Sequence, residues 1–96
     1  MTSKQRAYLK GLAMTIDPVT QIGKEGLSDA LTLSVDQALH KRELIKLAVL
    51  QTSPVSARDA APVLEERLRC KVVQVIGNRI VLYRRNREKP KLELPK

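Results

Sequence analysis

The sequence predicts an α/β fold, an open two-layer sandwich with a four-stranded mixed sheet and helices packed on one face. Segments of helical and strand periodicity follow one another in the order α-β-α-β-α-β-β. Gly77-Asn78 is a two-residue hairpin signal between two strand-like stretches. In the register that this turn implies, one face of the hairpin is apolar and the other is mixed. Helices are therefore expected on the apolar face alone.

The first helix is expected over residues 2–13. Thr2 and Gln5 have the spacing of a capping box, in which each side chain satisfies a free backbone N–H of the first turn. Asp17-Pro18 ends the helical region, because proline pushes the preceding residue out of the α conformation. The positions expected to face the core follow the i, i+3, i+4, i+7 rule. They are Leu9, Leu12, Ala13 and Ile16.

A short strand at 19–22 and the turn at 23–26 lead into the second helix. Ser28 and Asp29 begin this helix, with the acid in the first turn, where the helix dipole favours it. Lys41 and Arg42 lie at its C-terminal end, where positive charge is favoured. A strand is expected over residues 43–50. The apolar positions are Leu31, Val35, Ala38 and Leu39 in the helix, and Ile45, Leu47 and Val49 in the strand.

The start of the third helix has two solutions. Ser56 with Asp59 resembles a capping box, but a helix that begins there places Pro62 in its interior, where a hydrogen bond is lost. A start at Asp59 puts Pro62 in the first turn, where no intrahelical donor is missing. The later start, or a kink at Pro62, is the preferred interpretation.

The hairpin around Gly77-Asn78 sets the register of the last two strands. It is expected to pair Ile76 with Arg79, Val75 with Ile80, and Val73 with Leu82. The apolar face then holds Val73, Val75, Ile80 and Leu82. The mixed face holds Val72, Gln74, Ile76, Arg79, Val81 and Tyr83.

The chain carries a formal net charge of +8 over 96 residues, and this charge is unevenly distributed. Residues 1–24 carry +3, residues 25–83 carry +1, and residues 84–96 carry +4. Such a field favours a polyanion, most often nucleic acid. The expected organisation is one domain over residues 1–84 and a basic C-terminal tail at 85–96, which is too charged and proline-rich for regular structure.

Composition also limits where the protein can act. The single cysteine, Cys70, excludes a disulfide framework, fits a reducing compartment and has no metal-ligand spacing around it, so it is expected to be structural. The only histidine, His40, is expected on a helix surface. No apolar run is long enough to span a membrane. We therefore expect a cytoplasmic protein with no membrane partner, no metal and no cofactor.

The segment Gly23-Lys24-Glu25-Gly26 is the strongest candidate for a binding site. Glycine permits positive φ and lets a bulky ligand approach the backbone without meeting a Cβ. The helix that follows offers free N–H groups and the positive end of its dipole, which attract phosphate. KH domains clamp a nucleic-acid backbone with such a GXXG loop, although plain turn chemistry explains many glycine pairs equally well.

Four blocks in order, SKQRAYLKGLA, P-x-x-QIGKEGL, RELIK and VQVIGNRIVLYR, resemble the bacterial YhbY-type single CRM domain (chloroplast RNA splicing and ribosome maturation). The resemblance spans about residues 4–84. It implies a fold similar to the C-terminal domain of translation initiation factor 3. It also implies RNA binding through the GxxG loop and association with precursors of the large ribosomal subunit. One position departs from the family, which usually has His where this chain has Met14.

The expected function is therefore an RNA-binding protein that associates with pre-ribosomal large-subunit RNA, or the pre-ribosomal particle, and assists ribosome assembly. No small-molecule substrate is expected. With only Tyr8 and Tyr83 as aromatic residues, recognition should depend on phosphate, sugar and RNA shape rather than on base stacking. The candidate RNA-binding residues are Gly23, Lys24, Glu25, Gly26, Lys4, Arg6, Lys10, Arg79, Arg84 and Arg85.

Two other classes of function remain as alternatives. Charge alone also fits a non-specific architectural DNA-binding protein, although no helix pairs a basic face with base-reading residues in a helix-turn-helix arrangement. A hydrolase or transferase is disfavoured, because one histidine, one cysteine, no phosphate-binding loop and no paired carboxylates leave no catalytic constellation.

Overall fold

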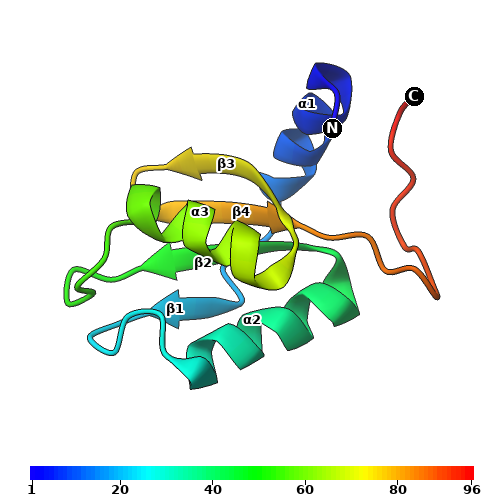
Figure 1. The fold of residues 1–96 in the computed structure, drawn as a ribbon. Coiled ribbons are helices and arrows are strands. Elements are labelled where there is room, and N and C mark those ends of the chain that lie inside the picture. Colours follow the sequence, from blue (N-terminus) through cyan, green and yellow to red (C-terminus); the bar gives the residue numbers. More distant parts are fainter.

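The computed structural model describes all 96 residues, as three helices and a four-stranded mixed sheet (Figure 1). The strand order is β1-β2-β4-β3, with β1 parallel to β2 and the other neighbouring pairs antiparallel. The expected element order and the mixed sheet are confirmed. The elements are α1 (Ser3–Ala13), β1 (Thr20–Ile22), α2 (Asp29–Arg42), β2 (Leu44–Val49), α3 (Ala57–Leu68), β3 (Lys71–Ile76) and β4 (Arg79–Tyr83).

The sheet separates two hydrophobic clusters. Ile45 and Leu47 of β2, with Ile80 and Leu82 of β4, pack against α2 and α3 in the larger cluster. Alternate residues of the same strands point to the opposite face and pack against α1 in the smaller cluster. The expectation that helices cover one face alone is therefore wrong. Figure 1 shows α1 standing apart from the α2–α3 pair. The smaller cluster comprises Leu9, Ala13, Leu44, Val73, Val81 and Tyr83.

A bulge in β3 accounts for part of this error. The expected pairs Val75–Ile80 and Ile76–Arg79 are present, but Leu82 pairs with Val72 instead of Val73. The register shifts between Val72 and Gln74, so the extra residue turns Val73 onto the α1 face. Both faces of the hairpin therefore carry buried apolar side chains.

The third helix begins earlier than preferred from the sequence. Ser56 is the N-cap, and its Oγ accepts a hydrogen bond from the N–H of Asp59 at 3.1 Å. The start at Asp59 is therefore wrong, and Pro62 lies inside the helix at an exposed position. The earlier start adds this cap and buries Ala57 against the core, which offsets the one hydrogen bond that proline removes.

Residues 84–96 form no helix or strand, but the chain turns back beyond β4 and runs toward the side of the molecule where α1 lies (Figure 1). Leu92 and Leu94 pack against the smaller cluster, which includes Leu9 of α1. The backbone N–H groups of Lys91 and Leu92 donate to the Glu43 carboxylate at 2.6 and 2.8 Å. The C-terminal segment thus contributes to the α1 face of the core.

Candidate nucleic-acid interface

The segment Gly23–Gly26, called the glycine turn below, connects the end of β1 to the start of α2. Within this turn, the backbone N–H of Gly26 donates to the carbonyl of Gly23 at 2.9 Å. Gly26 has φ of +62°, and a Cβ there would lie 3.0 Å from Cγ of Pro54. The fold itself therefore requires glycine at 26, both for backbone conformation and for packing against the loop that follows β2.

Gly23 has a different status. Its φ lies outside the left-handed region, and a Cβ there would meet only Cδ1 of Leu50 at 3.8 Å and Oγ1 of Thr52 at 3.9 Å. These are ordinary van der Waals distances, so alanine would fit at this position. The fold itself therefore does not require glycine at 23.

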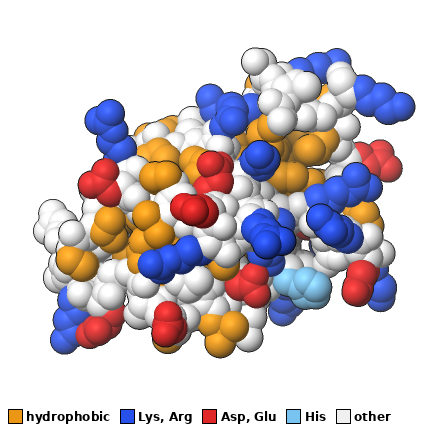
Figure 2. Space-filling model, in the orientation of Figure 1, with side chains coloured by type: hydrophobic (Ala, Val, Ile, Leu, Met, Phe, Trp, Pro, Cys, Tyr) orange, Lys and Arg blue, Asp and Glu red, His pale blue; other side chains and the backbone are white.

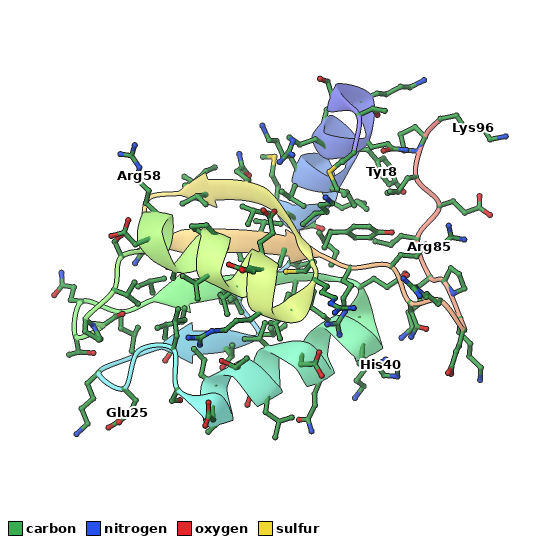
Figure 3. All side chains as sticks on the ribbon, in the orientation of Figure 1. Tyr8, Glu25, His40, Arg58, Arg85 and Lys96 are labelled. Carbon is green, nitrogen blue, oxygen red and sulfur yellow. The ribbon has the colours of Figure 1, made fainter.

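The tip of the glycine turn is open. Lys24 and Glu25 are exposed, and their backbone N–H groups donate no hydrogen bond within the protein. Figure 3 shows Glu25 projecting outward from the end of this loop. Two residues further, Ser28 caps α2 by accepting from the N–H of Leu31 at 3.1 Å. Unpaired amides, a lysine and a helix N-terminus thus occur within a few residues, which is chemistry suited to phosphate.

Arg79 lies at the same end of the sheet as the glycine turn. The carbonyl of Asn78 accepts from the N–H of Val49, and the carbonyl of Ile22 accepts from the N–H of Leu50, at 2.7 and 2.9 Å. The hairpin turn and the glycine turn therefore both adjoin the carboxyl end of β2. The Arg79 guanidinium donates to Oδ1 of Asn78 at 2.8 Å and is partly exposed.

The three candidates on α1 are not brought to the glycine turn, because α1 packs on the opposite face of the sheet from α2. Lys4 is exposed and Lys10 is half-buried. Arg6, a candidate RNA-binding residue from the sequence, is partly buried and engaged within the fold. Its Nη1 donates to the carbonyls of Val72 and Val73 at 2.6 and 2.9 Å, which holds α1 to the bulge of β3.

Arg84 and Arg85 lie beyond β4, next to the C-terminal half of α2. The Arg84 guanidinium forms an ion pair with Oδ1 of Asp36 at 2.7 Å and donates to the carbonyls of Leu68 and Asp36. Its hydrogen-bonding capacity is thus largely used within the fold. Arg85 is exposed and its side chain donates no hydrogen bond within the protein.

Glu43 is an important residue that the sequence analysis passed over. It follows α2 with φ of +65° and is fully buried. Burial raises the pKa of its carboxyl, but backbone hydrogen bonds from Asn86, Lys91 and Leu92, together with the charge of Arg85, lower the pKa below its ordinary value. An acid after a helix C-terminus, where the dipole disfavours it, was the available signal.

Cys70 is buried, and burial raises its pKa to about 11, so its thiol stays protonated and unreactive at neutral pH. His40 is exposed, as expected. No three His, Cys, Asp or Glu side chains come together in an arrangement that could hold a metal ion. None of the helices has the length and apolar character needed to cross a membrane.

Comparison with known proteins provides independent evidence on the family to which the chain belongs. The chain is 40% identical over 95 residues to the Bacillus subtilis protein named "Probable RNA-binding protein YqeI", with 99% of each chain covered. It is 32% identical over 96 residues to a Haemophilus influenzae protein named "RNA-binding protein", with 100% of this chain and 96% of the relative covered. The names describe RNA-binding proteins and no enzymes, which supports the prediction that this chain is not an enzyme.

The solution structure of the Staphylococcus aureus protein SAV1595 has the same fold, with a TM-score of 0.79, 44% sequence identity and 99% of each chain covered. The family model described as the CRS1 / YhbY (CRM) domain matches residues 1–84, which include all seven helices and strands and the glycine turn. The chain therefore belongs to the CRS1 / YhbY (CRM) domain family.

Proposed function

We propose that this protein binds RNA, associates with precursor RNA of the large ribosomal subunit in the pre-ribosomal particle, and assists ribosome assembly. Family membership and the names of the relatives support RNA as the ligand. The observation that carries the proposal is the exposed glycine turn, with unpaired N–H groups at Lys24 and Glu25 immediately before a helix N-terminus. The RNA contact is assigned to this turn.

In the proposed contact, a phosphate group approaches the backbone at Gly23 and accepts hydrogen bonds from the free amides. Lys24 supplies a mobile positive charge, and the dipole of α2 adds to the attraction. Glu25 has the wrong sign and stays directed away from the phosphate. Arg79 contributes positive charge at the same end of the sheet, and Lys4, Lys10 and Arg85 contribute it elsewhere on the molecule.

Base stacking has a small part in this proposal. Tyr83 is 6% exposed and is part of the smaller hydrophobic cluster, so Tyr8 is the only aromatic side chain that reaches solvent substantially. A protein that reads single strands by stacking needs several such platforms, each contributing about 1–3 kcal/mol. Recognition of phosphate, ribose and RNA shape suits folded ribosomal RNA better.

The first test replaces Lys24 and Glu25 with aspartates. The double variant should lose binding to large-subunit ribosomal RNA, measured by competition binding at low ionic strength, with its melting temperature nearly unchanged. Its matched control is Glu93→Asp with Lys96→Asp, which makes the same charge change at exposed tail positions. Retained affinity in the loop variant, or equal competition by duplex DNA, would contradict the proposal.

Gly23→Ala provides a second arm of the same experiment. Because a Cβ at 23 fits the fold, this variant should melt like the unmodified protein. It should nevertheless bind the same RNA at least several-fold more weakly, because the added methyl group separates phosphate from the backbone. Unchanged affinity would show that the ligand does not approach the main chain at this position.

A further inference from the structure

A groove of about 870 Å³ lies far from the glycine turn. Its walls come from the C-terminal parts of α2 and α3, the beginning of β3, the end of β4 and the first residues of the tail. The 14 residues of α2 span about 20 Å, at 1.5 Å per residue, and run from the glycine turn toward this groove. Figure 2 shows Lys and Arg side chains around a hollow near the one histidine, which is His40.

The groove is strongly basic. Five cations line it, against the two carboxylates of Asp36 and Glu88, and Asp36 is already paired with Arg84. The other four cations are exposed, and their side chains form no ion pair and donate no hydrogen bond within the protein. These four are Arg69, Lys71, Arg85 and Arg87.

Stability of the fold explains at most one of these four charges, because only Arg85 acts on a buried group, the carboxyl of Glu43. The ends of α2 and α3 do expose carbonyl groups that need donors, but other groups supply them. Arg84 donates to the carbonyls of Asp36 and Leu68, and Nδ2 of Asn86 donates to the carbonyl of His40 at 2.9 Å. Four like charges around one groove repel one another, so they are best understood as counter-charges for an external anion.

The glycine turn alone has little net attraction for a polyanion. Two cations lie at or beside the turn, Lys24 and Arg67, whose guanidinium donates to the carbonyl of Leu27 at 3.2 Å, and the acids Glu25 and Asp29 of the same segment balance them in number. Affinity for a phosphate backbone rises with the number of cations that displace its counterions. A ligand that also reaches the groove gains four cations that form no ion pair, against the single unpaired carboxylate of Glu88.

We propose that this basic groove is a second binding site for the phosphate backbone of RNA, so that one folded RNA contacts both ends of α2. The inference rests on the proposed function. It adds a second contact surface and requires an RNA long enough to contact both ends of α2. The glycine turn contacts one backbone segment through amides. The groove contacts a second segment, about 20 Å away, through guanidinium and ammonium groups.

The test is a triple variant, Arg69→Gln with Lys71→Gln and Arg87→Gln. Arg85 is left in place, because its charge also acts on buried Glu43. The control removes three other exposed cations that neither line the groove nor lie at the C-terminal end of α2, by Arg58→Gln, Lys89→Gln and Lys96→Gln. Both variants have the same net charge, and their melting temperatures are compared first to establish that both are folded.

Binding to large-subunit ribosomal RNA is then measured as a function of KCl concentration. The groove variant should bind at least tenfold more weakly than the control variant. The slope of log affinity against log salt should fall by about 2, since each lost phosphate contact removes about 0.7–0.9. Equal affinity and slope in the two variants would overturn the proposal. Displacement of the RNA from the groove by polyglutamate of equal charge would also overturn it, in favour of an acidic protein partner.

The outcome separates the two proposed sites. If the variant with aspartates at 24 and 25 loses binding while the groove variant matches its control, the glycine turn stands and the groove is wrong. If the groove variant loses binding while the loop variant does not, the groove stands and the assignment to the glycine turn is wrong.

Discussion

Glu43 is the only charged residue whose side chain is fully buried, and it holds the C-terminal segment in place. Its carboxylate accepts from the N–H groups of Asn86, Lys91 and Leu92 at 2.6–2.8 Å. Glu43 also has a positive φ, a conformation that costs a residue with a Cβ about 1–3 kcal/mol. The three charge-assisted hydrogen bonds offset that cost, so the residue type and the conformation belong together.

Glu43→Gln should therefore destabilise the protein at neutral pH by about 1–3 kcal/mol, because one acceptor oxygen becomes an N–H donor facing N–H groups. A melting temperature lower by about 4–8 °C per kcal/mol would register this in thermal denaturation. Glu93→Gln is the control, because Glu93 is exposed and should change stability by less than about 0.5 kcal/mol.

The pH dependence has a definite sign. The folded state lowers the pKa of Glu43 below its ordinary value of 4.5. Its stabilising contribution is thus present above that pH and is lost as pH falls through the lowered pKa. The difference between Glu43→Gln and the unmodified protein should shrink on acidification over that range. A difference that stays constant with pH would contradict the role assigned to the carboxylate.

For the glycine pair, the sequence predicts the turn but not the separate roles of the two glycines. The spacing correctly predicted a turn before a helix. It could not tell which glycine the fold requires, because that depends on Pro54, which is distant in the chain and lies against Gly26. Only the structure separates Gly26, which the fold needs, from Gly23, which it does not.

The helix α1 packs against residues of β2, β3 and β4, and its polar attachment is to β3. Periodicity correctly predicted its capping box and its buried residues Leu9 and Ala13. Turn chemistry could not predict the bulge at Val73, which arises inside a strand and shifts side chains between the two faces. The bulge adds Val73 to the face that already holds Val81 and Tyr83, which enlarges the apolar surface on which α1 packs. Arg6 then bonds to the carbonyls at this irregularity.

Arg6→Gln should lower the free energy of unfolding by about 1.5–3 kcal/mol, the range for hydrogen bonds to a charged group. Lys10→Gln removes the same charge from the same helix and should leave stability nearly unchanged, because Lys10 donates no hydrogen bond within the protein. Urea denaturation of the two variants measures the difference. Equal stabilities would show that the guanidinium does not hold α1 to β3.

Across the whole molecule, charge is arranged by the fold in a way that linear order conceals. The sequence correctly indicated basic ends and a near-neutral middle. It grouped Arg6 and Arg84 with the free cations, although tertiary contacts use both. The sequence also could not predict that Arg69 and Lys71 lie in one groove with Arg85 and Arg87. These residues come together only because β3 pairs with β4 and the tail begins beside α2.

The proposed binding surface has two ends, with main-chain amides at one end of α2 and cations that form no ion pair at the other. The measurement that separates it from diffuse attraction is an amide NMR titration of the full chain with a folded ribosomal RNA stem-loop at low ionic strength. The amide signals of Gly23, Lys24 and Glu25 should shift or broaden on addition of RNA and recover in high salt. If RNA binds and these three signals stay unchanged, the glycine turn is not the binding site.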